Sequence, residues 1–300
     1  MYSFSPKLKL VSIILLVAGL VLFTAGYFMN HGMDDTRIEH MMEAAMSSGE
    51  KAPSHSSEVM TPAKDHEGHL KHAKHQIHNQ PLASIHFIAV FFFGVSCAVM
   101  FFYSIQHVAH AGWPIIITRV MEAIGGYIPY GGAILIIIML LNITHNGHLF
   151  HWMDPELTDP NSDQFDVILF EKKKFLNIPW YAFRTILYVV GASFLAWKLR
   201  QMSRKVDETK SLRDYQYLYR WAVGYIVFFG FASAAWAWDW LMSIDPHWYS
   251  TMYIWYSMVS CLSSGIAVII ILSVYLKKTG FLPQFNDNHL HDLGVFLFAS

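Results

Sequence analysis

The stretch 236–256 reads WAWDWLMSIDPHWYSTMYIWY and joins two long apolar runs, 221–242 and 250–276. Trp and Tyr gather in it as they do at a membrane–water boundary, where the ring body lies in lipid and the polar tip stays wet. Asp239, Asp245 and His247 lie within this aromatic segment. A carboxylate near the end of a spanning helix costs a few kcal/mol unless it faces protein or water, so we expect Asp239 to have a partner. The segment predicts a proton-handling face at the outer side of a polytopic membrane protein.

The composition favours the lipid bilayer. Of 300 residues, 14% are charged and 54% are apolar, whereas a soluble domain carries roughly 25% charge. The net charge of −1 gives no reason to expect a nucleic-acid partner. Cys97 and Cys261 both lie in apolar runs and form no CxxC or CxxCH, so they predict buried thiols rather than an iron–sulfur cluster or attached haem.

Six apolar runs are long enough to cross a bilayer, which takes about 20 helical residues. They are 8–29, 82–108, 115–143, 178–199, 221–242 and 250–276. A seventh begins near His291 and reaches Ser300 after about ten residues, too few to span, so we expect the natural protein to continue. The fold class predicted is an all-α polytopic integral membrane protein. It divides into an N-terminal transmembrane helix (1–29), a His-rich extracytoplasmic loop (30–81) and a transmembrane helical domain (82–300).

Lys and Arg in short loops predict the orientation. The segment 198–220 holds seven of them and is expected on the cytoplasmic side, together with Lys7, Lys9, Lys277 and Lys278. The N-terminus is then cytoplasmic, and the loop 243–249, which has no Lys or Arg, lies outside. Three lysines at 172–174 are an exception, placed outside in an otherwise acidic loop. The first run resembles a signal peptide, but it is long and lacks an obvious cleavage site.

The expected outer loop carries histidines at every third position: His66, His69, His72, His75 and His78. Such a tract can bind transition metals or buffer protons. A solvated linker with incidental histidines is the alternative that we favour, and we predict no metal site.

Charges inside the apolar runs are the candidates for chemistry. Arg119 and Glu122 are three residues apart, so they share one helix face and are expected to pair. The glycines that follow, within 125–132, predict a broken or closely packed helix. Arg184 lies about 9 Å inside its run; it either pairs with Asp239 or extends its long side chain back to the surface.

Histidines at helix ends are proton-relay candidates. His86 opens the second run and His145 closes the third, so both are expected at the outer side, while His107 and His110 lie near the inner end. Two imidazoles facing each other could ligate haem iron. The sequence offers no pairs at matched depths on two helices, so a relay role is the preferred interpretation.

The segment WDWLMSIDPHWYSTMYIWY resembles the second large membrane subunit of bacterial alternative complex III, a quinol:electron-acceptor oxidoreductase, related to the NrfD-type (polysulfide-reductase) membrane anchors. The resemblance covers the chain from about Ile85 onwards, and 239–256 is its most specific part. It implies NrfD-like helical bundles, ten helices in all, of which this chain supplies six and the start of a seventh. It implies no cofactor on this subunit, with quinol, c-type haems and iron–sulfur clusters held elsewhere in the complex.

The partners implied are a sister NrfD-like subunit and subunits carrying haem c and iron–sulfur clusters, in the bacterial inner membrane. The subunit resembled is proposed to hold polar half-channels for protons. Only Asp239, Asp245 and His247 lie in the matching motif. The burial argument adds Arg119, Glu122, Arg184, His86 and His145.

The resemblance, together with the buried charges, therefore implies a subunit, without catalysis of its own, that conducts protons during quinol oxidation. Two alternatives come from other classes: a structural anchor for peripheral redox subunits, and a haem b or quinone-binding subunit. A secondary transporter is less favoured because no internal repeat is visible.

Overall fold

The computed structural model describes residues 6–32, 62–144, 147, 149–162 and 165–300. They divide into two compact units, one reaching Ile85 and the other beginning at His86, with Gly147 and Leu149 grouping with the first. Each unit is described by itself.

In the N-terminal unit, helix α1 (Pro6–His31) has an apolar sequence and exposed apolar side chains. A helix that is apolar all round needs lipid or protein around it. Helix α3 (Pro62–Val108) begins in this unit and contains Pro81. A proline cannot donate to the carbonyl four residues before it. Asn30 Nδ2 donates to that carbonyl, Ile77 O, at 2.8 Å.

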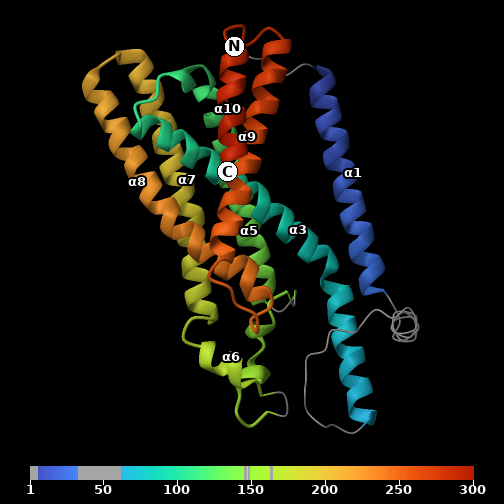
Figure 1. Cartoon of the computed structure of the whole chain (residues 1–300). Helices are drawn as coiled ribbons and strands as arrows, with labels where there is room; N and C mark the ends of the chain where they lie inside the picture. The colour runs from blue at the N-terminus through green and yellow to red at the C-terminus, as the bar shows by residue number, and fades with distance from the viewer. Residues whose placement is uncertain (1–5, 33–61, 145–146, 148, 163–164) are drawn as a thin grey trace. The chain divides into compact units, whose positions relative to one another are not determined.

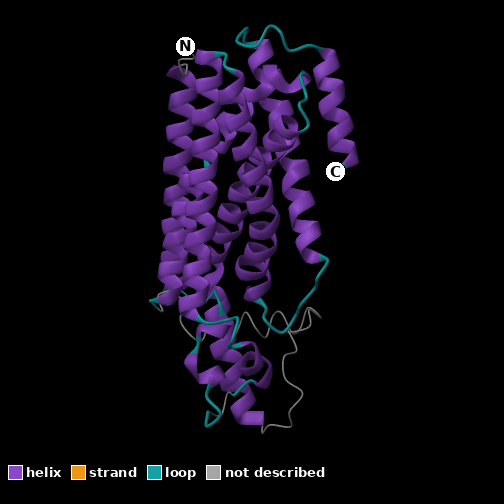
Figure 2. Ribbon diagram, turned by 90° about the vertical axis from the view of Figure 1, so that its left-hand side faces the viewer, coloured by secondary structure: helices purple, strands orange, loops and turns teal. Residues whose placement is uncertain are grey.

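In the C-terminal unit every described regular element is a helix or a helical turn (Figures 1 and 2). After α3 come a 3₁₀ turn and the longer helices, in this order: η1 (Trp113–Ile117), α4 (Thr118–Gly125), α5 (Ile128–Ile143), α6 (Val167–Lys172), α7 (Ile178–Thr209), α8 (Leu212–Trp236), α9 (Tyr253–Lys278) and α10 (Asp287–Ala299). Short turns complete the chain: η2 (His151–Met153), η3 (Pro155–Thr158), the π-helical η4 (Ala237–Leu241) and η5 (Met242–Ile244).

Among the described residues, six segments are long and apolar enough to cross a membrane: Lys9–Asn30, Asn79–Val108, Trp113–Ile143, Ile178–Thr209, Leu212–Ile244 and Tyr253–Lys278. Each overlaps one of the six apolar runs of the sequence. The prediction of an all-α, multi-pass membrane protein is confirmed.

The third span is broken, as its glycines predict. Helix α4 ends at Gly125 and α5 begins at Ile128. Beyond the break, α5 packs closely on α7. A Cβ on Gly132 would lie 2.3 Å from Val189 Cγ1, so only glycine allows the two helices to approach this closely. Helices α7 and α8 form an adjacent pair joined by a short turn (Figure 1).

Two segments are more helical than their polarity suggests. Helix α7 continues to Thr209 and α8 begins at Leu212, so most of the basic segment 198–220 is helical rather than loop. Lys, Arg, Gln and Glu are good helix formers in water. Lys210, with a left-handed φ of 50°, ends α7. Likewise α3 begins at Pro62, inside the region 30–81 expected to be a loop; proline is favoured at a first helical position.

Candidate functional site

Asp239 lies in the π-helical turn that ends α8, and its carboxylate is 0% exposed. Arg184 of α7 donates from Nε to Oδ2 at 2.7 Å and from Nη2 to Oδ1 at 2.6 Å. Tyr188, one turn further along α7, donates its hydroxyl to Oδ2 at 3.2 Å. We call Asp239, Arg184 and Tyr188 the Asp239 centre. A two-bond guanidinium–carboxylate pair is the strongest way to hold a buried acid.

Arg184 also connects this centre to the loop before α7. Its Nη1 and Nη2 donate to Phe175 O at 3.3 and 3.2 Å, and its guanidinium carbon lies 4.1 Å from the centre of the Phe175 ring. The Arg184 side chain is only 8% exposed. The structure thus shows the pairing with Asp239 rather than a side chain extended into water.

The π turn is held by side chains from other helices. A π turn shifts the backbone hydrogen bonds and marks functional sites often. His86 Nε2 lies 2.7 Å from Trp240 O, and Trp240 Nε1 donates to Thr185 of α7 at 3.1 Å. Ser243 donates its hydroxyl to Asp239 O. The other ring nitrogen of His86, Nδ1, is buried without a hydrogen-bond partner, so this imidazole retains one free position for a proton or a water.

A second buried acid lies near the other end of α7. Glu122 of α4 is buried, and Arg119 Nη1 donates to its Oε2 at 2.5 Å. Arg119 also pairs through Nη2 with Asp207 of α7, and the Tyr103 hydroxyl lies 3.5 Å from Glu122 Oε1. We call Glu122, Arg119, Asp207 and Tyr103 the Glu122 centre. The predicted Arg119–Glu122 pair is present, with two partners that the sequence did not indicate.

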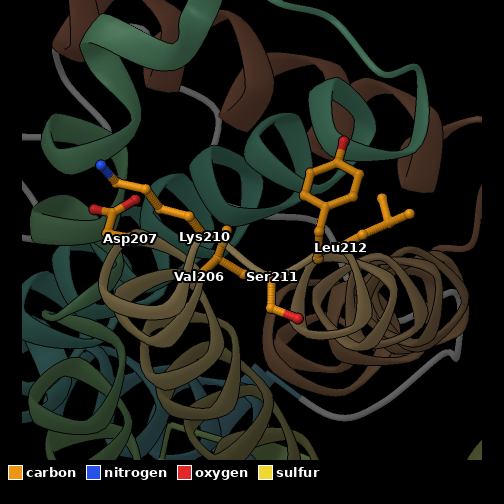
Figure 3. Close-up of a pocket in the computed structure, with 6 residues that line it drawn as sticks. Val206, Asp207, Lys210, Ser211 and Leu212 are labelled. Atoms are coloured by element: carbon orange, nitrogen blue, oxygen red, sulfur yellow. The ribbon is translucent and has the colours of Figure 1, made fainter.

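The Glu122 centre opens to solvent, because Arg119 is 45% and Asp207 67% exposed. Asp207 lines a pocket of about 580 Å³ at the turn between α7 and α8 (Figure 3). Lys210 and Ser211 line the same pocket. A charge pair that reaches such a pocket can exchange protons and ions with water.

His107 and His110 belong to an aromatic group beside this centre. The His107 ring lies 4.4 Å from the Tyr103 ring. His110 Nδ1 lies 3.1 Å from the Tyr215 hydroxyl, and the His110 ring stacks on Tyr219. The structure therefore places both histidines against tyrosine side chains.

The two centres lie at opposite ends of α7. Arg184 and Asp207 are 23 positions apart in the sequence, which corresponds to about 35 Å along a helix axis. After Tyr188 the buried side chains of α7 are the apolar Val189, Ala192, Ala196 and Leu199, followed by Ser203 one turn before Asp207. From Val189 to Leu199 the buried side of α7 is therefore apolar. The two polar centres are separated along the helix and are not joined by a continuous row of polar side chains on α7.

Asp245 and His247 lie in the loop after η5. His247 Nε2 is 2.5 Å from Asp166 Oδ2, and Asp245 is 3.9 Å from His247 Nδ1. Partial burial alone would raise the pKa of Asp166, but its hydrogen bonds with His247 and with the N–H groups of Ile168 and Leu169 outweigh burial and lower that pKa. We call Asp166, Asp245 and His247 the loop cluster. Asp245 and His247 belong to the same sequence motif as Asp239, but the Asp239 carboxylate pairs instead with Arg184 of α7.

Sequence reasoning missed Tyr188, Tyr103, Asp207 and Asp166. Tyr188 could have been predicted from the sequence, because it follows Arg184 by four residues and so lies on the same helix face. The others come from distant segments, and no local spacing indicates them. His145, a predicted relay residue, lies outside the described residues, as do the side chains of the histidine tract.

Within the described part of the chain, no three His, Cys, Asp or Glu side chains gather as metal ligands would. Cys97 and Cys261 are buried free thiols, as predicted. Compared with models of known protein families and with curated proteins, the chain matches none.

Proposed function

We propose that this chain is an integral membrane subunit of a quinol:electron-acceptor (cytochrome c) oxidoreductase, of the kind represented by alternative complex III. In this proposal it lies in the bacterial inner membrane with its N-terminus in the cytoplasm. It binds no redox cofactor; the haem c and iron–sulfur groups belong to partner subunits, beside a sister NrfD-like subunit. Its own contribution is to conduct protons across part of the bilayer as quinol is oxidised.

The observation that carries the proposal is the buried Asp239 with Arg184 and Tyr188. Ionisable groups inside a membrane are costly and usually mark ion or proton pathways. The chain repeats the same combination of acid, arginine and tyrosine at Glu122. Two such centres near opposite ends of one helix fit two half-channels, each serving its own side of the membrane.

Each group has its own role in this scheme. Asp239 would accept and release protons at the outer end, with His86 Nδ1 as a neighbouring buried position for a proton. The loop cluster, which contains His247, would exchange protons with the outer solution, since an imidazole ring can both accept and donate a proton. Glu122 with Arg119 would serve the inner end, where Asp207 reaches the pocket.

Proton release per quinol oxidised by the purified complex tests the proposal. Asp239→Asn and Glu122→Gln are expected to lower the stoichiometry or the rate. The control is Asp214→Asn, because Asp214 is also a buried acid paired with a base, Lys205, but belongs to neither centre. Unchanged proton release in both test variants would contradict a role in conduction.

A structural anchor is the second candidate, and the complete pairing of Asp239 favours it. A buried ion pair that is fully hydrogen-bonded can serve to fix helix positions. In that case the same variants would reduce the amount of assembled complex, seen on a native gel with an activity stain, while each assembled complex would keep its turnover.

A further inference from the structure

The last three turns of α7 carry a basic pocket outside the two centres. It measures about 480 Å³ and is lined by Trp197, Arg200, Gln201, Met202, Arg204, Lys205 and Glu208. Arg200 and Arg204 are four residues apart and therefore share one face of the helix. The same face carries Trp197 one turn earlier.

The charges of this pocket are not balanced by the part of the chain that the structure describes. Lys205 pairs with Asp214 at 2.7 Å. Arg200 and Arg204 form no ion pair with any described residue, and Glu208 is the one acidic side chain among the lining residues. Two arginines without acidic partners in one pocket favour a bound anion, because guanidinium groups match phosphate oxygens in geometry.

Arg200 occupies a place built for it. Its guanidinium lies at the break between α4 and α5, where a Cβ on Gly126 would be 2.9 Å from Arg200 Nη1. The glycine in the broken segment therefore leaves room for this side chain. Arg204, one turn further, is exposed.

The pocket lies where the apolar part of α7 gives way to its polar end. Trp197 is 55% exposed, and Phe194, one turn earlier, is also an exposed aromatic residue. Exposed Trp near the end of a spanning helix is typical of the membrane–water interface. Lys198 Nζ lies 5.7 Å from the Trp197 ring and 5.8 Å from the Trp221 ring, which adds a further cation at this level. Acyl chains can lie against Phe194 and Trp197 while a head group reaches the arginines.

We infer that this pocket binds the phosphate-diester head group of an anionic phospholipid. Clusters of Lys and Arg at the end of a spanning helix attract such head groups, and the residues that line this pocket all come from the polar end of α7. The inference needs only the membrane-spanning character of the chain and is independent of proton conduction.

Native mass spectrometry of the purified full-length chain in mild detergent tests it, by titration with phosphatidylglycerol and with phosphatidylcholine of the same acyl chains. The Arg200→Gln/Arg204→Gln variant is expected to bind phosphatidylglycerol roughly 30-fold more weakly, since each basic residue near a membrane surface contributes on the order of a fivefold gain. Arg204→Gln alone changes only an exposed residue and is expected to weaken binding roughly fivefold.

The matched control is Arg213→Gln/Arg220→Gln, which removes two charges from α8 beside Tyr217 and outside the pocket. It should keep the affinity for phosphatidylglycerol within about twofold of the unmodified chain. Equal losses in both double variants would mean general attraction and overturn the inference, as would equal binding of phosphatidylcholine. Displacement of the lipid by inorganic phosphate would identify a free-anion site and overturn the lipid assignment.

Discussion

The Asp239 centre and the Glu122 centre use the same groups in different surroundings. In both, an arginine pairs with a buried carboxylate that also contacts a tyrosine hydroxyl. Arg184 is enclosed, whereas Arg119 is 45% exposed and shared with the exposed Asp207. The same pair of charges therefore has a fixed structural environment at one end of α7 and a solvent-accessible one at the other. The comparison teaches that burial of the arginine, more than burial of the acid, separates the two centres.

The largest expected effect is that of Arg184→Gln, which leaves Asp239 buried without its charge partner. Breaking a buried pair on one side costs about 3–5 kcal/mol. The free energy of unfolding in detergent, measured by titration with a denaturing detergent, should fall by that amount. Lys198→Gln on the same helix is the control, because Lys198 lies beside the Trp197 and Trp221 rings and donates to Gln201, with no acidic partner among the described residues. A loss of less than about 1 kcal/mol in Arg184→Gln would show that Asp239 readily becomes neutral or reaches water.

His86→Phe tests the support of the π turn in the Asp239 centre. It removes the partner of Trp240 O inside a buried site, and an unsatisfied buried group costs about 1–3 kcal/mol. The same unfolding assay measures the loss. His291→Phe, which changes an exposed histidine on α10, is the control and should cost less. Equal stability of His86→Phe and the unmodified chain would show that His86 does not stabilise the π turn.

Arg119→Gln tests the more exposed Glu122 centre. It should lower the free energy of unfolding by about 1 kcal/mol, because solvent screens a half-exposed ion pair. The effect should shrink further in high salt, which screens exposed charges more than buried ones. The free energies of unfolding of this variant and of Arg184→Gln, each measured at low and at high salt, show whether the two ion pairs are screened differently. Equal salt dependence in the two variants would contradict the difference in burial.

The smallest effect concerns the loop cluster and depends on pH. The pKa of Asp166 is lowered in the folded chain, so its contribution to stability is present at neutral pH. That contribution is lost as the pH falls from the ordinary aspartate value, about 3.9, through the lower pKa of the folded state. His247→Gln removes part of the cause and should lower Tm slightly at neutral pH, with the difference vanishing in acid. A difference that grows on acidification would contradict the lowered pKa.

Much of the fold could be predicted from the sequence, because a run of about 20 apolar residues forms a spanning helix in nearly every case. The glycines at 125–132 predicted the break between α4 and α5 for the same local reason. The helical ends of α7, α8 and α3 were not predicted, since polar helix formers look like loops when only hydropathy is considered.

The residues of the candidate site likewise include some that the sequence predicted and some that it did not. The pairs Arg119–Glu122 and Arg184–Asp239 followed from depth and spacing. Asp207 and Asp166 required knowledge of which helix ends and loops meet, and one sequence does not contain that. Asp245 and His247 belong to the motif by sequence, yet the structure places them in a loop with Asp166.

The most direct test follows each buried carboxyl group by infrared difference spectroscopy, with the complex in vesicles and the pH changed on one side at a time. Asp239→Asn and Glu122→Gln assign the two bands. We expect the Asp239 band to respond to one side and the Glu122 band to the other, because apolar side chains separate the centres along α7. If neither carboxyl group gains or loses a proton from either side, the two centres are fixed ion pairs and the proposal of proton conduction is wrong.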